Sequence, residues 1–115
     1  RLLIIYNSLQ EQINICKPDL CSVERLFFGR NTTTAEYVYQ ARGVIMLLAA
    51  LNKIPVTEPK PNQIKLALCG VGDAEKIQVQ RMVQRFLNLD EIPKPDDTAD
   101  ALAAAVTGLA MEFSR

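Results

Sequence analysis

Apolar residues recur at helical spacing at the start of the chain. Their steps of three and four residues are typical of one face of an amphipathic helix. They are Leu2, Ile5, Leu9, Ile13 and Cys16. "KPD" at residues 17–19 ends this helix, because proline lacks a backbone N–H and disfavours helix in the residue before it. Residues 20–28, "LCSVERLFF", then predict a short buried strand.

The rest of the chain alternates one more strand with further helices. The pattern predicts a helix over residues 32–52, a short edge strand over residues 54–60, and helices over residues 61–70, 73–89 and 98–115. We take Asn31 or a following threonine as the cap of the helix over residues 32–52. We take Asp73 as the cap of the helix over residues 73–89. The order indicates an α/β fold with a small parallel sheet of about two strands and about five helices.

Composition narrows the function classes. The 115 residues suit one domain, and 13 basic residues balance 13 acidic ones, so net charge does not indicate a strongly basic nucleic-acid binder. The absence of histidine excludes a Cys/His zinc site and a histidine-based triad. Three cysteines without metal-type spacing predict reduced, mostly buried thiols in a cytoplasmic protein. The longest apolar run is far shorter than the roughly 20 residues of a membrane span, so no membrane partner is expected.

Carboxylates in unusual places are the first candidates for chemistry. Glu24 lies inside the first apolar strand, where it either faces solvent, caps a helix or binds a metal. Asp96, Asp97 and Asp100 crowd the start of the last helix. Helix capping and the helix dipole explain one or two of them, and the alternative is that Asp97 and Asp100, three residues apart on one side of the helix, bind Mg²⁺.

Basic and aromatic residues give a second, weaker set of candidates. "GVGDAEK" at residues 70–76 lacks a phosphate-loop pattern and predicts a turn into a helix, although Lys76 there could contact a DNA phosphate. A basic strip on the helices is an alternative to an ordinary solvated surface. Its members are Lys65, Lys76, Arg81 and Arg85. Phe27, close to Arg30, either belongs to the core or a dimer contact or stacks on an unpaired base.

Three segments together resemble one known family. "SVERLFFGRNTTTAEYVYQARGV", "KLALCGVGDAEKIQVQRMV" and "DDTADALAAA" are similar, in order and spacing, to the RuvC-type Holliday junction resolvases, which are crossover junction endodeoxyribonucleases. The resemblance implies a ribonuclease H-like fold. It also implies a homodimer that nicks two opposed strands of four-way junction DNA with two Mg²⁺ ions, Mn²⁺ being possible, and that works with a branch-migration motor in the cytoplasm.

The resemblance also implies roles for individual residues. Glu24, Asp97 and Asp100 match metal-binding catalytic carboxylates, and Lys65 and Lys76 match lysines implicated in catalysis and DNA contact. Asp96 then becomes a bystander or a cap. The residues expected to contact DNA are Phe27, Arg30, Asn31, Arg42, Lys65, Lys76 and Arg81. The helix over residues 32–52 matches the dimer-forming helix, with small residues at Ala35, Gly43, Ala49 and Ala50 and apolar surface at Val38, Ile45, Met46 and Leu48.

One departure separates the chain from the family pattern. The family begins with a β-hairpin unit whose first strand carries an essential aspartate, whereas this sequence starts with Arg1 at the family's first helix. We therefore expect a single RuvC-type nuclease domain over residues 1–115 that lacks this hairpin and is inactive alone. The alternatives are a non-catalytic fragment that binds junctions and dimerises, and a structural helix-rich subunit with incidental carboxylates.

Overall fold

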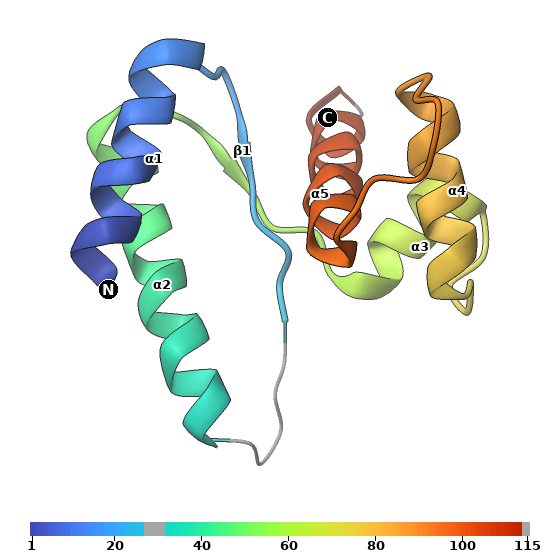
Figure 1. The fold of residues 1–115 in the computed structure, drawn as a ribbon, viewed down its shortest axis with the longest axis horizontal. Coiled ribbons are helices and arrows are strands. Elements are labelled where there is room, and N and C mark those ends of the chain that lie inside the picture. The colour runs from blue at the N-terminus through green and yellow to red at the C-terminus, as the bar shows by residue number, and fades with distance from the viewer. Residues whose placement is uncertain (27–31, 114–115) are drawn as a thin grey trace. The chain divides into compact units, whose positions relative to one another are not determined.

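The computed structural model describes residues 1–26 and 32–113. Figure 1 shows the helices and two short strands, which alternate at first and are followed by three consecutive helices. The elements are α1 (Leu2–Cys16), β1 (Cys21–Ser22), α2 (Thr32–Leu51), β2 (Val56–Thr57), α3 (Pro61–Cys69), α4 (Lys76–Phe86) and α5 (Asp96–Phe113). Across the described residues, the predicted α/β order with five helices and a two-stranded sheet is confirmed. None of these helices is both long and apolar enough to cross a membrane.

The chain divides into two compact units. The first comprises Arg1–Cys21 and Phe27–Val56, and the second comprises Ser22–Leu26 and Thr57–Arg115. In the first unit, α1 and α2 lie side by side (Figure 1). The amide groups of Gln10 and Asn52 hydrogen-bond to each other at 3.2 and 3.0 Å, and Leu48 and Ala49 are almost fully buried in the chain. The pairing of the two helices thus rests on apolar packing and a reciprocal amide contact.

A parallel ladder joins β1 to β2 and extends beyond both strands. The N–H groups of Cys21, Val23 and Arg25 donate to the carbonyls of Pro55, Thr57 and Pro59, respectively. The partners advance together by two residues at each step, which is the register of parallel strands. The strand predicted over residues 20–28 is therefore shorter than expected, and its last two residues lie outside the described part of the chain.

Local signals explain where the helices of the second unit begin and end. Pro61 opens α3, and Gly70 ends it with a φ of 79°, as predicted from the sequence. The prediction of Asp73 as a cap is wrong. Helix α4 begins three residues later, after Glu75, whose backbone N–H donates to the Gln78 side chain at 2.7 Å.

Small residues on α5 allow it to approach the sheet and the other helices closely. The core of the second unit is formed by Ile64, Leu68, Val83, Ala103 and Ala104. The Ser22 hydroxyl donates to the Ala104 carbonyl at 2.6 Å. A Cβ atom added at Gly108 would lie 2.7 Å from Thr57 Oγ1 and would also collide with Ser22. Gly108 is thus required by close packing of α5 on the strands.

The cysteines differ in part from the prediction. All three are free thiols, but Cys16 is exposed, and Cys21 and Cys69 are only partly buried. Burial nevertheless raises the pKa of the Cys21 thiol. Cys16 is the last residue of α1.

Candidate active site

The strand after β1 brings Glu24 to α5. Ser22 contacts Ala104 on α5, and alternate residues of an extended chain point to the same side, so Glu24 also faces α5. Two residues of strand and one helical turn both span about 6 Å. Asp100 lies one turn before Ala104, and the two carboxylates therefore meet at the same level.

A pocket of about 260 Å³ forms around this pair, entirely within the second unit. Three helices complete its wall, with two lysines among otherwise apolar residues. The lining residues are Glu24, Pro61, Ile64, Lys65, Lys76, Val79, Asp100 and Ala103. The structure thus brings together four of the five predicted catalytic residues, which are Glu24, Lys65, Lys76 and Asp100.

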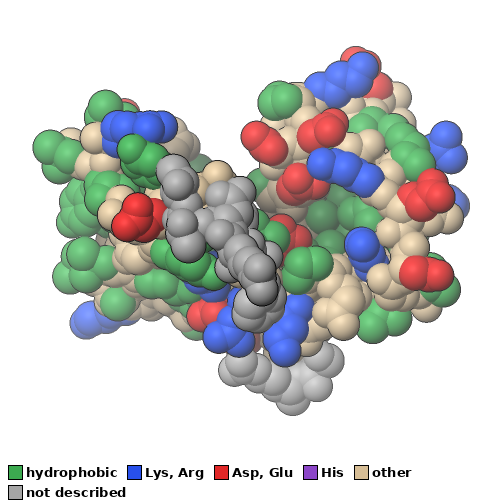
Figure 2. Space-filling view, turned by 90° about the horizontal axis from the view of Figure 1, so that it is seen from below, with side chains coloured by type: hydrophobic (Ala, Val, Ile, Leu, Met, Phe, Trp, Pro, Cys, Tyr) green, Lys and Arg blue, Asp and Glu red, His purple; other side chains and the backbone are tan. Residues whose placement is uncertain are grey.

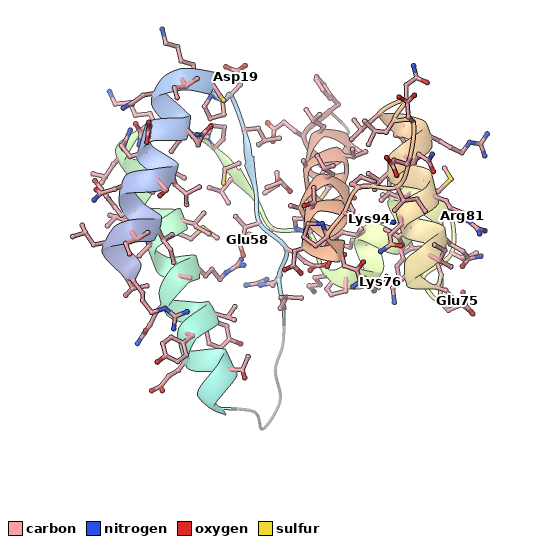
Figure 3. The ribbon with its side chains drawn as sticks, viewed as in Figure 1. Asp19, Glu58, Glu75, Lys76, Arg81 and Lys94 are labelled. Atoms are coloured by element: carbon pink, nitrogen blue, oxygen red, sulfur yellow. The ribbon has the colours of Figure 1, made fainter. Side chains whose placement is uncertain are left out.

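Lys76 connects α4 to the first turns of α5. Its ammonium lies 3.6 Å from Asp96 Oδ2 and 3.7 Å from Asp100 Oδ2. The Nε2 group of the buried Gln80 lies 3.3 Å from the other oxygen of Asp96. Asp96, which the sequence suggested is a bystander or a cap, thus contacts both Lys76 and Gln80. Figure 3 shows Lys76 on the side of α4 that faces α5.

The pocket places Glu24 in an unfavourable electrostatic environment. Burial and the nearby Asp100 carboxylate raise the pKa of Glu24, and Lys76 lowers it in part. A divalent cation between the carboxylates would relieve both effects. Hard carboxylate oxygens are the ligands that Mg²⁺ prefers, so Glu24 and Asp100 fit such an ion in kind.

The number of metal ligands is smaller than expected. Within residues 1–26 and 32–113, no three Asp, Glu or Cys side chains are grouped so as to hold a metal ion. Asp97 is exposed on the first turn of α5 and is not among the residues that line the pocket. Its role as a third metal ligand stays a prediction.

The residues expected to contact DNA are not all at the pocket. Phe27, Arg30 and Asn31 lie outside the described residues. Arg42 belongs to the first unit and is half-buried on α2. Arg81 is exposed on α4, turned about 140° from Lys76 around the helix axis because five residues separate them. Lys76 and Arg81 therefore do not form one continuous basic strip, as Figure 3 shows.

Sequence reasoning missed Gln80 and undervalued Asp96. The available signal was the position of Gln80 on the buried row of α4, one turn after Lys76 and three residues before Val83. A buried amide needs a hydrogen-bond partner. The start of α5 could supply one only if α4 and α5 packed together, and local patterns do not establish that packing.

The chain matches known proteins along most of its length. The family model described as "Crossover junction endodeoxyribonuclease RuvC" matches residues 1–108. The chain is 54% identical over 106 residues to RuvC of Desulfitobacterium hafniense, covering 92% of this chain and 64% of that relative. RuvC of Thermotoga petrophila is 50% identical over 105 residues, with 91% of this chain and 64% of that relative covered. The chain thus spans less than two thirds of the length of these relatives.

Solved structures agree with these matches. The structure of Thermus thermophilus RuvC aligns with a TM-score of 0.91 at 34% sequence identity, covering 98% of this chain and 68% of that chain. T. thermophilus RuvC in complex with a Holliday junction substrate aligns with a TM-score of 0.88 at 31% identity, with the same coverage. The ribonuclease H-like fold class is therefore confirmed. By sequence and by structure, the chain belongs to the RuvC family of crossover junction endodeoxyribonucleases.

Proposed function

We propose that this chain supplies most of the active site of a Mg²⁺-dependent endonuclease that resolves four-way DNA junctions by symmetric nicking, in recombination and repair. The pocket that gathers Glu24, Asp100, Lys65 and Lys76 is the observation that carries the proposal. The similarity to T. thermophilus RuvC bound to a Holliday junction supports the choice of substrate. We assign residues 1–115 to one RuvC-type nuclease domain and expect it to work in the cytoplasm, where bacterial chromosomal DNA is processed.

The pocket residues divide by charge into two roles. Glu24 and Asp100, with Asp97 as a further candidate, would hold Mg²⁺, and Mn²⁺ would use the same oxygen ligands. When bound, the metal would supply the positive charge that polarises the phosphate and activates a water molecule. Lys65, half-buried in the pocket wall on α3, would pair with an oxygen of the scissile phosphate and fix its orientation. The carboxylates alone would repel that phosphate, so the lysines make its approach favourable.

DNA affinity has to rest on local contacts. In Figure 2, acidic and basic side chains are interspersed on the visible face of the second unit, and the chain has no net charge. A surface of mixed sign gives little non-specific attraction to a duplex. Selectivity for a junction is then expected from geometry and from unpaired bases. Phe27 remains our candidate for stacking there, with Arg30, Asn31, Arg42 and Arg81 as candidate backbone contacts.

Symmetric nicking requires two active sites, and we propose a homodimer that forms through α2. Exposed residues follow one another on α2 at steps of four, which places them in one gently curved row. The row consists of Tyr39, Gly43, Leu47 and Leu51. A twofold pair of such rows would cover apolar surface and place one pocket in each subunit. The branch-migration motor implied by the family resemblance stays a prediction.

A second candidate function is junction binding and dimerisation without cleavage. The observation that favours it is the small number of metal ligands, because the described residues contain no group of three. Two metal ions about 4 Å apart repel each other strongly and need bridging negative charge. We therefore expect the 115 residues alone to bind a four-way junction but to nick it slowly or not at all.

The two candidates are separated by comparing the 115-residue chain with a completed chimera. The chimera carries, before Arg1, the N-terminal strands that the resemblance implies, taken from D. hafniense RuvC. We expect both proteins to prefer a four-way junction over a linear duplex of the same sequence in a gel-shift assay. Only the chimera should nick opposed strands of the junction, and only with Mg²⁺ or Mn²⁺.

Three outcomes would contradict these expectations. If each protein bound the junction and the duplex with equal affinity, neither protein would be selective for junctions. A folded, junction-binding chimera without metal-dependent nicking would leave the non-catalytic role in place of the endonuclease. Normal nicking by the 115 residues alone would show that no further aspartate is required.

A further inference from the structure

Lys76 lies where its positive charge would compete with a metal ion for the same carboxylate. Its ammonium lies 3.7 Å from Asp100, the carboxylate that we assign to the metal, and 3.6 Å from Asp96. The lysine and both aspartates are about half-exposed or more, so each ion pair is weak and exchangeable. A divalent ion bound at Asp100 would lie close to this positive charge and would be repelled by it.

Asp96 differs from Asp100 in how it is held. The side chain of Gln80, on the buried row of α4, contacts Asp96 Oδ1 at 3.3 Å, while Oδ2 faces Lys76. Asp96 is not among the residues that line the pocket, whereas Asp100 is. The two partners of Lys76 are therefore inequivalent, since Asp100 faces the metal position and Asp96 is fixed outside the pocket.

We propose that Lys76 is a tethered counter-cation that competes with the divalent metal for Asp100, and that Asp96, positioned by Gln80, retains Lys76 when the metal binds. This proposal rests on the metal site of the proposed function. It deepens the role of Lys76 and gives Asp96 a positioning role. In the metal-free chain the ammonium offsets the repulsion around Asp100. When the metal binds Asp100, the Lys76 ammonium shifts fully to Asp96. The ion pair with Asp96 lowers the free-energy cost to Lys76 of losing Asp100 as a partner.

The test is Mn²⁺ binding to the 115-residue chain, measured by the loss of the free-ion signal in electron paramagnetic resonance. Lys76→Met is expected to bind Mn²⁺ about three- to tenfold more tightly than the unmodified chain, because no ammonium then competes for Asp100 or repels the bound ion. Lys94→Met is the matched control. Lys94 is exposed just before α5, so its substitution tests for a general effect of removing a nearby positive charge.

A double-mutant cycle separates Asp96 as a holder of Lys76 from Asp96 as a metal ligand. Asp96→Asn is expected to weaken Mn²⁺ binding a few-fold, because Lys76 then relies on Asp100 alone. In the Lys76→Met background, Asp96→Asn should change Mn²⁺ affinity little. An equal loss in both backgrounds would show instead that Asp96 binds the metal directly, and would overturn its positioning role.

Other outcomes are equally decisive. Unchanged or weaker Mn²⁺ binding by Lys76→Met, or the same gain in Lys94→Met, would overturn the competition while leaving the metal site in place. If the unmodified chain, Lys76→Met and the completed chimera all bind no Mn²⁺, the metal site of the proposed function fails instead. Far-ultraviolet circular dichroism and thermal melting of each variant establish that it is folded.

Discussion

At the scale of single residues, the ionised form of Glu24 is disfavoured by its surroundings. It lies between two backbone rungs of the parallel ladder and beside Asp100, partly removed from water. The ionised side chain is therefore less favourable in the folded chain than in water. We interpret this cost as the consequence of a binding function.

The cost of Glu24 predicts a pH-dependent gain in stability when its charge is removed. Burial and Asp100 raise its pKa above the ordinary value of 4.5, so the folded chain penalises the ionised form. This penalty is absent below that value and grows as pH rises through the raised pKa. Glu24→Gln should therefore stabilise the metal-free chain at about pH 7 and have little effect at about pH 4.

Urea denaturation at the two pH values measures this difference. Glu91→Gln, which removes an exposed carboxyl outside the pocket, is the control. Equal effects of Glu24→Gln at both pH values would show that the negative charge of Glu24 does not destabilise the chain. A loss of stability at neutral pH would show that the ionised side chain is a favourable structural partner.

The sequence predicted the composition of the site better than its arrangement. Glu24, Asp100, Lys65 and Lys76 were identified from residue type, spacing and resemblance, and the structure brings these four together. The link from Gln80 through Asp96 to Lys76 was missed. It depends on the packing of α4 against α5, and the sequence pattern of either helix says nothing about which side chains meet across that contact.

At the scale of elements, α5 determines the geometry of the pocket. It carries Asp100 and packs its small residues against the strand that carries Glu24. The closest point of this packing is Gly108, where a side chain would collide with Ser22 and Thr57. Thr57 Oγ1 is also buried without a hydrogen-bond partner, which indicates that little adjustment is possible there.

Gly108→Ala is therefore expected to destabilise the chain by about 1–3 kcal/mol, as overpacking of a core does. Gly43→Ala on α2, compared at a concentration at which the chain is monomeric, is the matched control, since a Cβ atom there has nothing within 4 Å in the chain. The control should be neutral or stabilise by about 0.5–1 kcal/mol, because alanine favours helix over glycine. Urea denaturation of both variants gives the comparison, and a gain in stability for both would mean that α5 can move away from the strands.

Element boundaries were harder to predict than element types. Pro61 and Gly70 marked α3 correctly, because proline and glycine act through local backbone geometry. The start of α4 was placed at Asp73, although Glu75 is the cap. Both residues can accept hydrogen bonds from a helix end, and the choice between them depends on tertiary contacts that bury Ala74.

At the scale of the whole molecule, the predicted dimer surface needs revision. Ala35, Leu48 and Ala49 were expected to contact a second chain, but each is buried within this one, at 9%, 1% and 2% exposure. Leu47 and Leu51 are 52% and 59% exposed, and we propose that they take their place. The sequence identified an apolar helix and could not assign its faces, because apolar residues surround most of its circumference.

Leu47→Glu is expected to shift the protein from dimer to monomer at micromolar concentration, since it places a charge in the proposed apolar contact. Sedimentation velocity of the 115-residue chain and of the completed chimera measures the change. Ile15→Glu, an equally drastic change at an exposed position of α1, is the control and should leave the dimer intact. An unmodified chimera that is monomeric, or a Leu47→Glu variant that still dimerises, would contradict the assignment of this surface.

We propose above all that the pocket around Glu24 and Asp100 cleaves four-way junctions. Single-turnover nicking of a four-way junction by the completed chimera, compared with its Glu24→Gln and Asp100→Asn variants, tests it most directly. We expect each variant to keep junction binding and to lose at least about a hundredfold in the nicking rate, because each removes charge that holds the metal. Glu91→Gln should nick at the unmodified rate. If Glu24→Gln and Asp100→Asn also nick at that rate, the pocket is not the active site.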